Sequence, residues 1–145
     1  MKVVIQRVSQ ASVMIDGAVH NEINQGFVVL LGIGQTDDDQ DINYLAQKIL
    51  GLRVFSDHEG KMNHSLDDVK GEILLISQFT LFADTSNGRR PTWQQAARGP
   101  QAEPLVENVV TALRDLGARV ETGKFGADMR ISAVCDGPMT VTLEV

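Results

Sequence analysis

Cysteine and long apolar runs are scarce in this sequence. Its 145 residues include one cysteine, Cys135, so a disulfide bond cannot form within the chain. A single cysteine is typical of a reducing compartment, and we expect a cytoplasmic protein. The apolar run at residues 3–5 is broken by Gln6 and Arg7, which makes it too short for a signal peptide. No stretch reaches the roughly 20 apolar residues that cross a membrane, so we expect no membrane partner.

Positive charge is scarce as well. Lysine and arginine total 13 against 19 aspartates and glutamates, for a net charge of −6, and such a surface repels the phosphates of nucleic acid in general. One segment reverses this balance, because residues 85–101 contain Arg89, Arg90 and Arg98 and no acidic residue. Such a segment is usually a solvated loop, but arginine also binds phosphate with a planar, permanently charged group. Both interpretations remain open.

The apolar pattern predicts several strands and two main helices. Apolar residues recur at helical spacing over residues 42–50 and again from Pro104 to residue 116. Residues 26–32 are continuously apolar, which predicts a strand buried on both faces. The other predicted strands are residues 2–8, 11–15, 18–23, 52–56, 72–83, 129–135 and 139–145, and a short helix is predicted near residues 92–98. With no repeat or linker in sight, we expect one α+β domain over residues 1–145.

Patterns that would indicate a cofactor or a metal are incomplete. Gly32-Ile33-Gly34 follows a predicted strand, as in dinucleotide-binding sites, but the third glycine of that motif is replaced by Asp37. A calcium loop beginning at Asp37 would need glycine and glutamate where the chain has Ile42 and Lys48. The three histidines lie on different predicted elements and lack the spacing of a zinc site. We therefore expect no cofactor and no metal.

Ser77-Gln78-Phe79-Thr80 places polar side chains in an otherwise apolar predicted strand. Buried polar groups need hydrogen-bond partners or a function. The polar side chains of this segment either bond to neighbouring backbone as the strand leaves the core, or form the polar floor of a small-molecule pocket. No base for Thr80 as a nucleophile can be identified from the sequence.

Asp136-Gly137-Pro138 lies between the last two predicted strands. This segment is either an ordinary loop or a tight turn with a cis bond before Pro138, and only the cis form would redirect the Gly137 carbonyl.

Several motifs together resemble one family over essentially the whole chain. They are Gln6-Arg7-Val8, Lys61-Met62-Asn63, Ser77-Gln78-Phe79-Thr80-Leu81, Gly88-Arg89-Arg90-Pro91, residues 122–129 (TGKFGADM) and Asp136-Gly137-Pro138-Met139-Thr140, in that order. By these motifs the sequence is similar to the D-aminoacyl-tRNA deacylases of the bacterial type, also called D-tyrosyl-tRNA deacylases. It departs from the family pattern at Cys135, where asparagine is usual, and we expect this to alter hydrogen bonding at the turn.

The resemblance implies a fold and an activity. It implies an α+β fold with a mostly antiparallel or mixed, curved sheet and two main helices, assembled as a homodimer with active sites at the subunit interface. The expected reaction is hydrolysis of the ester that joins a D-amino acid to the terminal adenosine of tRNA. Family members also remove glycine from tRNA, including alanine tRNA. The expected roles are therefore proofreading and tRNA recycling, with tRNA as a partner.

The resemblance also implies roles for particular residues. Gly137 and Pro138 would form a cis pair whose carbonyls enter the partner subunit's pocket and exclude L side chains, with Arg7 bracing the turn. Ser77, Gln78, Phe79 and Thr80 would form the catalytic segment, with backbone N–H groups of Phe79 and Thr80 donating to the ester carbonyl. Most of the chemistry would come from the substrate's 2′-hydroxyl, so we rank Thr80 low as a nucleophile.

Two further groups complete the expected substrate site. The residues expected beside the adenosine are Phe125, Gly126, Ala127 and Met129. The weaker candidates for contacts with tRNA phosphates are Arg89, Arg90, Arg98 and Lys124.

A noncatalytic module that binds RNA 3′ ends is the alternative. The basic segment and the lack of a classical catalytic set fit such a module equally well. It would show affinity for tRNA without turnover of the ester.

Overall fold

Strands make up most of the chain, and the computed structural model describes all residues, 1–145. The strands are β1 (Lys2–Ile15), β2 (Ala18–Ile23), β3 (Gly26–Gly32), β4 (Phe55–Ser56), β5 (Met62–His64), β6 (Glu72–Ser77), β7 (Arg119–Thr122) and β8 (Arg130–Glu144). The helices are α1 (Ile42–Gly51), α2 (Gly99–Asp115) and the short 3-10 helices η1 (Asp39–Asp41) and η2 (Phe79–Phe82). The predicted α+β class with two main helices is confirmed. No helix is both long enough and apolar enough to span a membrane.

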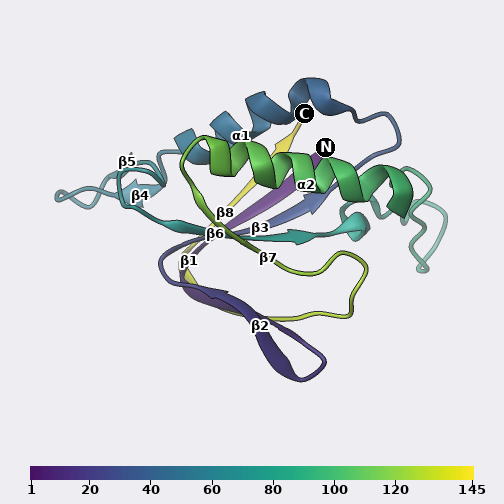
Figure 1. Cartoon of the computed structure of the whole chain (residues 1–145), viewed down its shortest axis with the longest axis horizontal. Helices are drawn as coiled ribbons and strands as arrows, with labels where there is room; N and C mark the ends of the chain where they lie inside the picture. Colours follow the sequence, from purple (N-terminus) through teal and green to yellow (C-terminus); the bar gives the residue numbers. More distant parts are fainter.

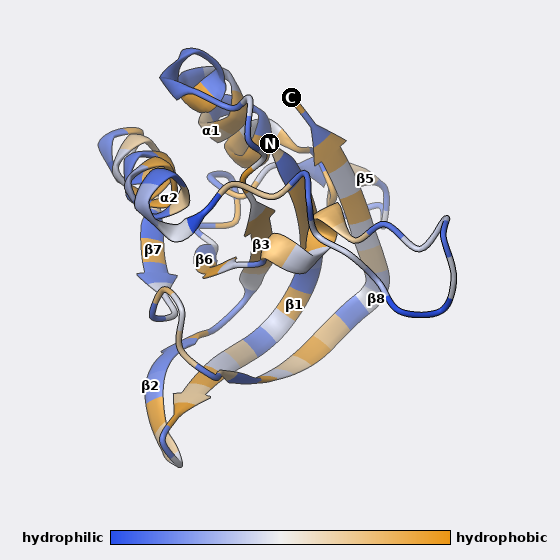
Figure 2. Cartoon of the chain, turned by 90° about the vertical axis from the view of Figure 1, so that its right-hand side faces the viewer, coloured by the Kyte–Doolittle hydropathy of each residue, from blue (hydrophilic) through white to orange (hydrophobic).

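The main sheet is mixed and centres on the long strand β1. Its order is β2-β1-β3-β6-β7, and β8 pairs with β1 as well. The β1 pairings are antiparallel, whereas β3 with β6 and β6 with β7 are parallel. One half of β1 pairs with β3 and the other half with β2, while β8 follows β1 over most of its length. Figure 2 shows β1 and β8 running side by side along this curved sheet.

Both long helices cover one face of the sheet. Each lies in a connection between parallel strands, α1 between β3 and β6 and α2 between β6 and β7. Connections between parallel strands of one sheet are right-handed. Two such connections that step in the same direction across the sheet therefore place their helices on the same face. Figure 1 shows α1 and α2 side by side above the sheet. The space between helices and sheet holds a core of 21 buried residues, among them Phe27, Leu45 and Leu113.

A second, smaller core lies on the other face of the sheet. It contains Val8, Ala11, Val13, Ile23, Val28, Leu74 and Ile76. The β1–β2 hairpin curls beneath the sheet on the side away from the helices (Figure 1). The two cores together bury both faces of β3 and β6, which explains why residues 26–32 and 73–76 are continuously apolar.

The strand predicted over residues 72–83 is wrong beyond residue 77. β6 pairs with β3 up to Leu31↔Ser77, and β3 itself ends at Gly32. After a last bond from the Gln78 N–H to the Leu31 carbonyl (2.7 Å), the chain turns into η2 because no strand remains for it to pair with. The polar segment is therefore a turn at the end of a strand.

The predictions over residues 92–116 also need correction. No helix forms at residues 92–98, because isolated bridges hold Thr92 against Asp84 and Ala96 against Gly34, with a turn between them. A bond from the Ala97 N–H to the Ile33 carbonyl (2.9 Å) accompanies the second bridge. α2 begins at Gly99 and contains Pro104, whereas the sequence placed the helix start at Pro104. The earlier start buries Ala102 on the same face as Leu105.

Four smaller differences concern strands. Residues 2–8 and 11–15 form one strand, β1, and only Phe55–Ser56 of the predicted strand at 52–56 is extended. The parallel edge strand β7 was not predicted from the sequence. β8 runs through the segment predicted as a loop, but its pairing is interrupted there. Gln6 pairs with Thr140 and Val8 with Cys135, so residues 136–139 bulge out opposite Arg7 alone.

Candidate active site

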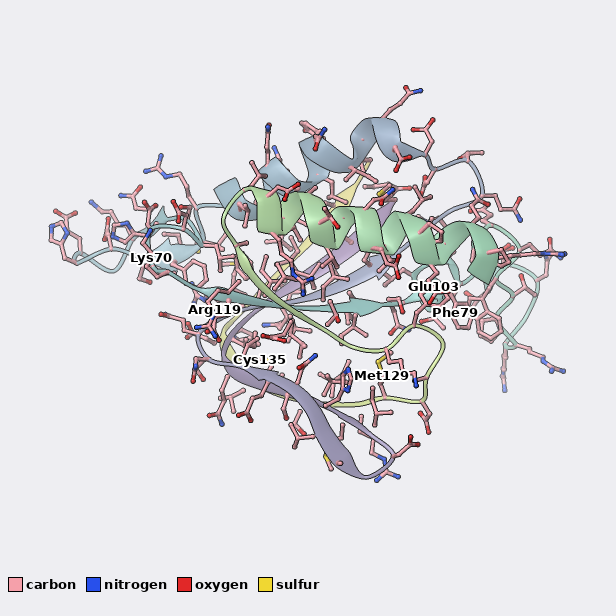
Figure 3. The ribbon with its side chains drawn as sticks, in the orientation of Figure 1. Lys70, Phe79, Glu103, Arg119, Met129 and Cys135 are labelled. Atoms are coloured by element: carbon pink, nitrogen blue, oxygen red, sulfur yellow. The ribbon has the colours of Figure 1, made fainter.

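A cavity of about 430 Å³ opens where the parallel strands β3, β6 and β7 end. It is lined by residues at or beyond the carboxyl ends of these strands, by the first turn of α2 and by the start of β8. In open sheets this edge is where ligands bind, because the connecting loops diverge there. Figure 3 shows Phe79 and Met129 on one side of the molecule, below Glu103 in α2, with Cys135 toward the other side.

The predicted catalytic segment lies at this cavity. Ser77, Gln78 and Phe79 line it, and Thr80 follows directly in η2. Because a helix leaves its first N–H groups without partners, those of Phe79 and Thr80 bond to no carbonyl of the chain. Two adjacent backbone donors without partners in the chain, one of them on a residue that lines the cavity, form an arrangement that can stabilise a developing oxyanion.

No titratable side chain lines the cavity. The Thr80 hydroxyl accepts a hydrogen bond from the Gln78 side-chain amide. An amide N–H is a donor and cannot take a proton from a hydroxyl, so it does not activate Thr80 as a nucleophile. Residues 77–79 of the polar segment line this cavity, and the Gln78 side chain bonds to the Thr80 side chain and not to neighbouring backbone. A role for this segment in binding a small molecule stays a prediction.

The residues predicted beside the adenosine form another wall of the cavity. Phe125, Gly126, Ala127 and Met129 all line it. They lie in the loop after β7, which is held by a bond from the Gly123 N–H to the Leu75 carbonyl (3.1 Å). Met129 also packs against the smaller core. An apolar surface of this kind suits an aromatic base.

The Gly137-Pro138 turn lies away from the cavity of its own chain. The peptide bond between these residues is cis, both residues are exposed, and neither lines the cavity. Arg7 is buried beneath the turn: its Nε lies 3.2 Å from the Asp136 carbonyl and 3.0 Å from the Asp136 carboxylate. The Arg7 guanidinium also donates to the Val54 carbonyl and lies over the Phe55 ring at 5.9 Å.

Gln6 is a further residue at the turn to which the sequence assigned no role. Its amide nitrogen lies 3.1 Å from both the Met139 and Arg7 carbonyls, and its amide oxygen accepts from the Thr140 hydroxyl. The bulge is thus held by Arg7 at its start and by Gln6 at its end. The only signal in the sequence was the motif that contains both residues.

The predicted phosphate contacts form no single cluster. Arg89 and Arg90 lie in an exposed loop closed by the bridge between Asp84 and Thr92. Arg98 and Lys124 are exposed and adjoin residues that line the cavity. No ion pair involves any of these four basic residues.

Trp93 is an exposed aromatic residue that the sequence did not single out for function. It makes an edge-to-face contact with Phe79, with ring centroids 5.5 Å apart. Elsewhere, no three His, Cys, Asp or Glu side chains gather where they could hold a metal ion.

These features define a single-domain α+β protein with an apolar pocket and oxyanion-type backbone donors. A family model described as D-Tyr-tRNA(Tyr) deacylase matches residues 4–144, so the chain belongs to that family of aminoacyl-tRNA ester hydrolases. The resemblance inferred from the sequence is confirmed.

Individual relatives agree with this assignment. The chain is 49% identical to a D-aminoacyl-tRNA deacylase of Symbiobacterium thermophilum, over 99% of this chain and 95% of that protein. It is 48% identical to the protein of the same name from Thermosipho africanus, over 99% and 97% of the two chains.

Solved structures are similar over the whole chain. A structure titled c-Myc DNA Unwinding Element Binding Protein has a TM-score of 0.94 at 40% identity, covering 100% of this chain and 99% of that one. A probable eukaryotic D-amino acid tRNA deacylase has a TM-score of 0.83 at 16% identity, covering 99% and 98%, and at that identity shows the shared fold alone.

Proposed function

We propose that this protein hydrolyses the ester bond of D-aminoacyl-tRNA, releasing the amino acid and the tRNA. The observation that carries this proposal is the pair of free backbone N–H groups, from Phe79 and Thr80, at a cavity with no titratable side chain. Such a site stabilises charge on an ester carbonyl without supplying a nucleophile or a base. Membership of the deacylase family and relatives named D-aminoacyl-tRNA deacylase support the same reaction.

The proposed reaction uses water and the substrate itself. The terminal adenosine occupies the cavity against Phe125 and Met129, with the ester carbonyl toward the free N–H groups. Water attacks the carbonyl carbon, the carbonyl oxygen takes up the negative charge, and the bond to the ribose oxygen breaks. The neighbouring 2′-hydroxyl orients the water and relays its proton to the leaving ribose oxygen. This route fits a cavity that offers no general base.

Chiral selection is proposed to involve both copies of a dimer. The Gly137-Pro138 turn is exposed and held out by Arg7 and Gln6, so it is available to enter the cavity of a partner subunit. Backbone carbonyls there would accept from the substrate ammonium, and an L side chain would collide with the turn. A D side chain would point outward, and glycine has none to exclude. Activity on glycine carried by tRNA, including alanine tRNA, follows from this geometry.

Exposed apolar residues on β8 support the dimer. Ile131 is 39% exposed and Val134 is 50% exposed on the strand that carries the turn. Large apolar side chains in this position are typical of an interface between subunits. We place the enzyme in the cytoplasm, where aminoacylated tRNA is found, with a role in proofreading and in tRNA recycling.

Parallel assays with D-tyrosyl-tRNA and L-tyrosyl-tRNA test the proposal. Enzyme at substoichiometric concentration should release D-tyrosine over many turnovers, with or without chelator, and should leave the L ester intact. A folded dimer that binds tRNA and cleaves neither ester would contradict the proposal. That result would favour the noncatalytic RNA-end binding module.

A further inference from the structure

We propose that Trp93 and Phe79 form a stacking platform for the nucleotide that precedes the terminal adenosine of the RNA 3′ end. Phe79 belongs both to this aromatic pair and to the lining of the cavity. The inference therefore rests on the proposed function, which places the adenosine in that cavity. It adds a second nucleotide-binding position outside it.

The exposure of this pair distinguishes it from the molecule's other aromatic pair, Phe27 and Phe55. The chain has one tryptophan, one tyrosine and five phenylalanines, and Phe27 and Phe55 lie deep in the core. Phe79, by contrast, is 56% exposed and Trp93 is 39% exposed. Their rings meet edge to face at an interplanar angle of 70°, so each ring keeps a face that the other does not cover. Aromatic surface left open in this way is typical of a binding site.

The pair leads from the cavity to the surface. Phe79 begins η2 and lines the cavity, whereas Trp93 comes from the loop between Asp84 and Ala97 and does not line it. In Figure 3, Phe79 lies at the periphery of the molecule, near the first turns of α2. A strand whose last base lies in the cavity can therefore leave it across Phe79 toward Trp93.

The charge of the segment that contains Trp93 favours a nucleic acid strand. Trp93 shares with Arg89 and Arg90 a segment, residues 85–101, that has no acidic residue in a chain of net charge −6. Arg89 and Arg90 are exposed and form no ion pair, so they are available for phosphates. Aromatic rings and free arginines in one segment are a combination that binds single-stranded nucleic acid, through base stacking and phosphate contacts. A purely apolar protein partner would use the rings alone.

The fluorescence of Trp93 tests the position directly. Trp93 is the only tryptophan, so the protein's tryptophan signal comes from this site. The probes are adenosine and the dinucleotide cytidylyl-(3′→5′)-adenosine. We expect the dinucleotide to quench the fluorescence and adenosine to leave it nearly unchanged while occupying the cavity. Equal responses to the two probes, or none to the dinucleotide, would overturn the platform.

Kinetics with a long and a short substrate test how much the Trp93–Phe79 platform contributes to substrate binding. Trp93→Ala should raise the KM for D-tyrosyl-tRNA about tenfold with little change in kcat, since stacking of one base is worth about 1.4 kcal/mol on this scale. The KM for D-tyrosyl-adenosine, which lacks the preceding nucleotide, should change less than about twofold. Trp93→Phe should restore most of the affinity because it keeps an aromatic ring. The matched control is Tyr44→Ala, which removes a ring that is 56% exposed on α1.

Two results would assign the Trp93–Phe79 pair a role other than binding a second nucleotide. If Trp93→Ala raised both KM values equally, the pair would act on the cavity and not on a second nucleotide. If Trp93→Ala dissociated a wild-type dimer in sedimentation, the rings would pack against the partner subunit. Either result overturns the platform while the proposed activity stands. If the wild type cleaved neither substrate, the proposed activity would fail, and the fluorescence titration would still decide whether Trp93 contacts the dinucleotide.

Discussion

Arg7 positions an exposed turn from a buried site. Burying a guanidinium is costly unless its N–H groups find acceptors. Arg7 meets this requirement with the Asp136 carbonyl and carboxylate on one side and the Val54 carbonyl on the other. Moving the turn would break several of these contacts at once. The position of Gly137 is therefore coupled to the core through one side chain.

Gly137→Ala should disable the turn without unfolding the protein. Gly137 has φ +119°, and an added Cβ would lie 2.9 Å from the Met139 nitrogen and 3.1 Å from Arg7 Nη2. The displaced turn should lower kcat/KM for D-tyrosyl-tRNA about 100-fold, the scale of a misplacement near 1 Å. Gly17→Ala is the control, because Gly17 also has positive φ (+82°) but open space around it. Equal activity of the two variants would show that the turn is not part of the site.

Thr80→Ala should retain most of its turnover. The Thr80 hydroxyl has the Gln78 amide as its partner and no base nearby, so we expect kcat within about tenfold of wild type. Removal of a covalent nucleophile would instead cost on the order of 10⁶-fold. Single-turnover assays, with circular dichroism to confirm folding, separate the two cases. A folded but inactive variant would refute substrate-assisted hydrolysis.

At the scale of elements, the end of β3 decides where η2 lies. A Cβ on Gly32 would stand 2.9 Å from the Gln78 carbonyl and 3.2 Å from the Leu81 Cβ, so the predicted catalytic segment approaches β3 only because Gly32 has no side chain. A Cβ on Gly34 would likewise stand 3.0 Å from the Phe82 ring. The two glycines that resembled part of a dinucleotide motif thus serve packing.

Gly32→Ala should therefore reduce activity more than its effect on stability would explain. We expect a stability loss of about 1–3 kcal/mol from overpacking, together with a large fall in kcat as η2 shifts. Gly51→Ala, at the end of α1 with open space around it, should keep full activity and gain about 0.5 kcal/mol. Thermal unfolding and steady-state kinetics measure both effects. Wild-type kcat in a folded Gly32→Ala protein would contradict this account of η2.

The β4–β5 hairpin has an acid-sensitive contact. Hydrogen bonds from the Asn63 side chain and from the Lys61 and Glu59 backbone hold the pKa of Asp57 below its ordinary value. Since the folded-state pKa is the lower one, Asp57 stabilises the protein above its unfolded-state pKa, and this contribution is lost as the pH falls through the folded-state pKa.

Asp57→Asn should consequently flatten the pH dependence of stability below about pH 4. The substitution should lower stability at pH 7 and have a smaller effect at low pH, where Asp57 is protonated in the wild type. Urea unfolding across this range measures the difference. An equal loss at both pH values would show that the charge of Asp57 does not matter. Asp67→Asn is the control, because Asp67 pairs with exposed Lys70 alone.

At the scale of the whole molecule, the cavity and the turn lie apart on one chain, which makes a shared site testable by mixing subunits. Gly137→Ala distorts the turn. Ala127→Trp places a large side chain in the cavity, because Ala127 lines it. Each homodimer should be inactive. Refolding the two variants together should restore about a quarter of wild-type activity, because half the dimers are mixed and each has one intact site. No recovery in verified mixed dimers would place the whole site within one chain.

The sequence predictions were right where contacts along a single element decide the structure, and wrong where contacts between distant elements decide it. The helix at residues 42–50 and the strand at 26–32 were predicted well because their apolar patterns reflect burial along a single element. The strand at 72–83 was overextended because its end depends on where β3 stops. The start of α2 was missed because Pro104 is a strong local signal, while the burial of Ala102 depends on the distant sheet.

By itself the sequence determined the α+β class, the family and most of the candidate site residues, because motifs and apolar periodicity involve residues close together in the sequence. The tertiary structure decided which of these residues meet. It brought residues 77–79, 125–127 and 129 to one cavity, left the Phe79 and Thr80 N–H groups free, and placed Gly137-Pro138 elsewhere. It also set Trp93 against Phe79. Such contacts depend on where strands end and how they pair across the sheet. Strand ends and pairing are set by residues far apart in the sequence, because both cores must be buried at once.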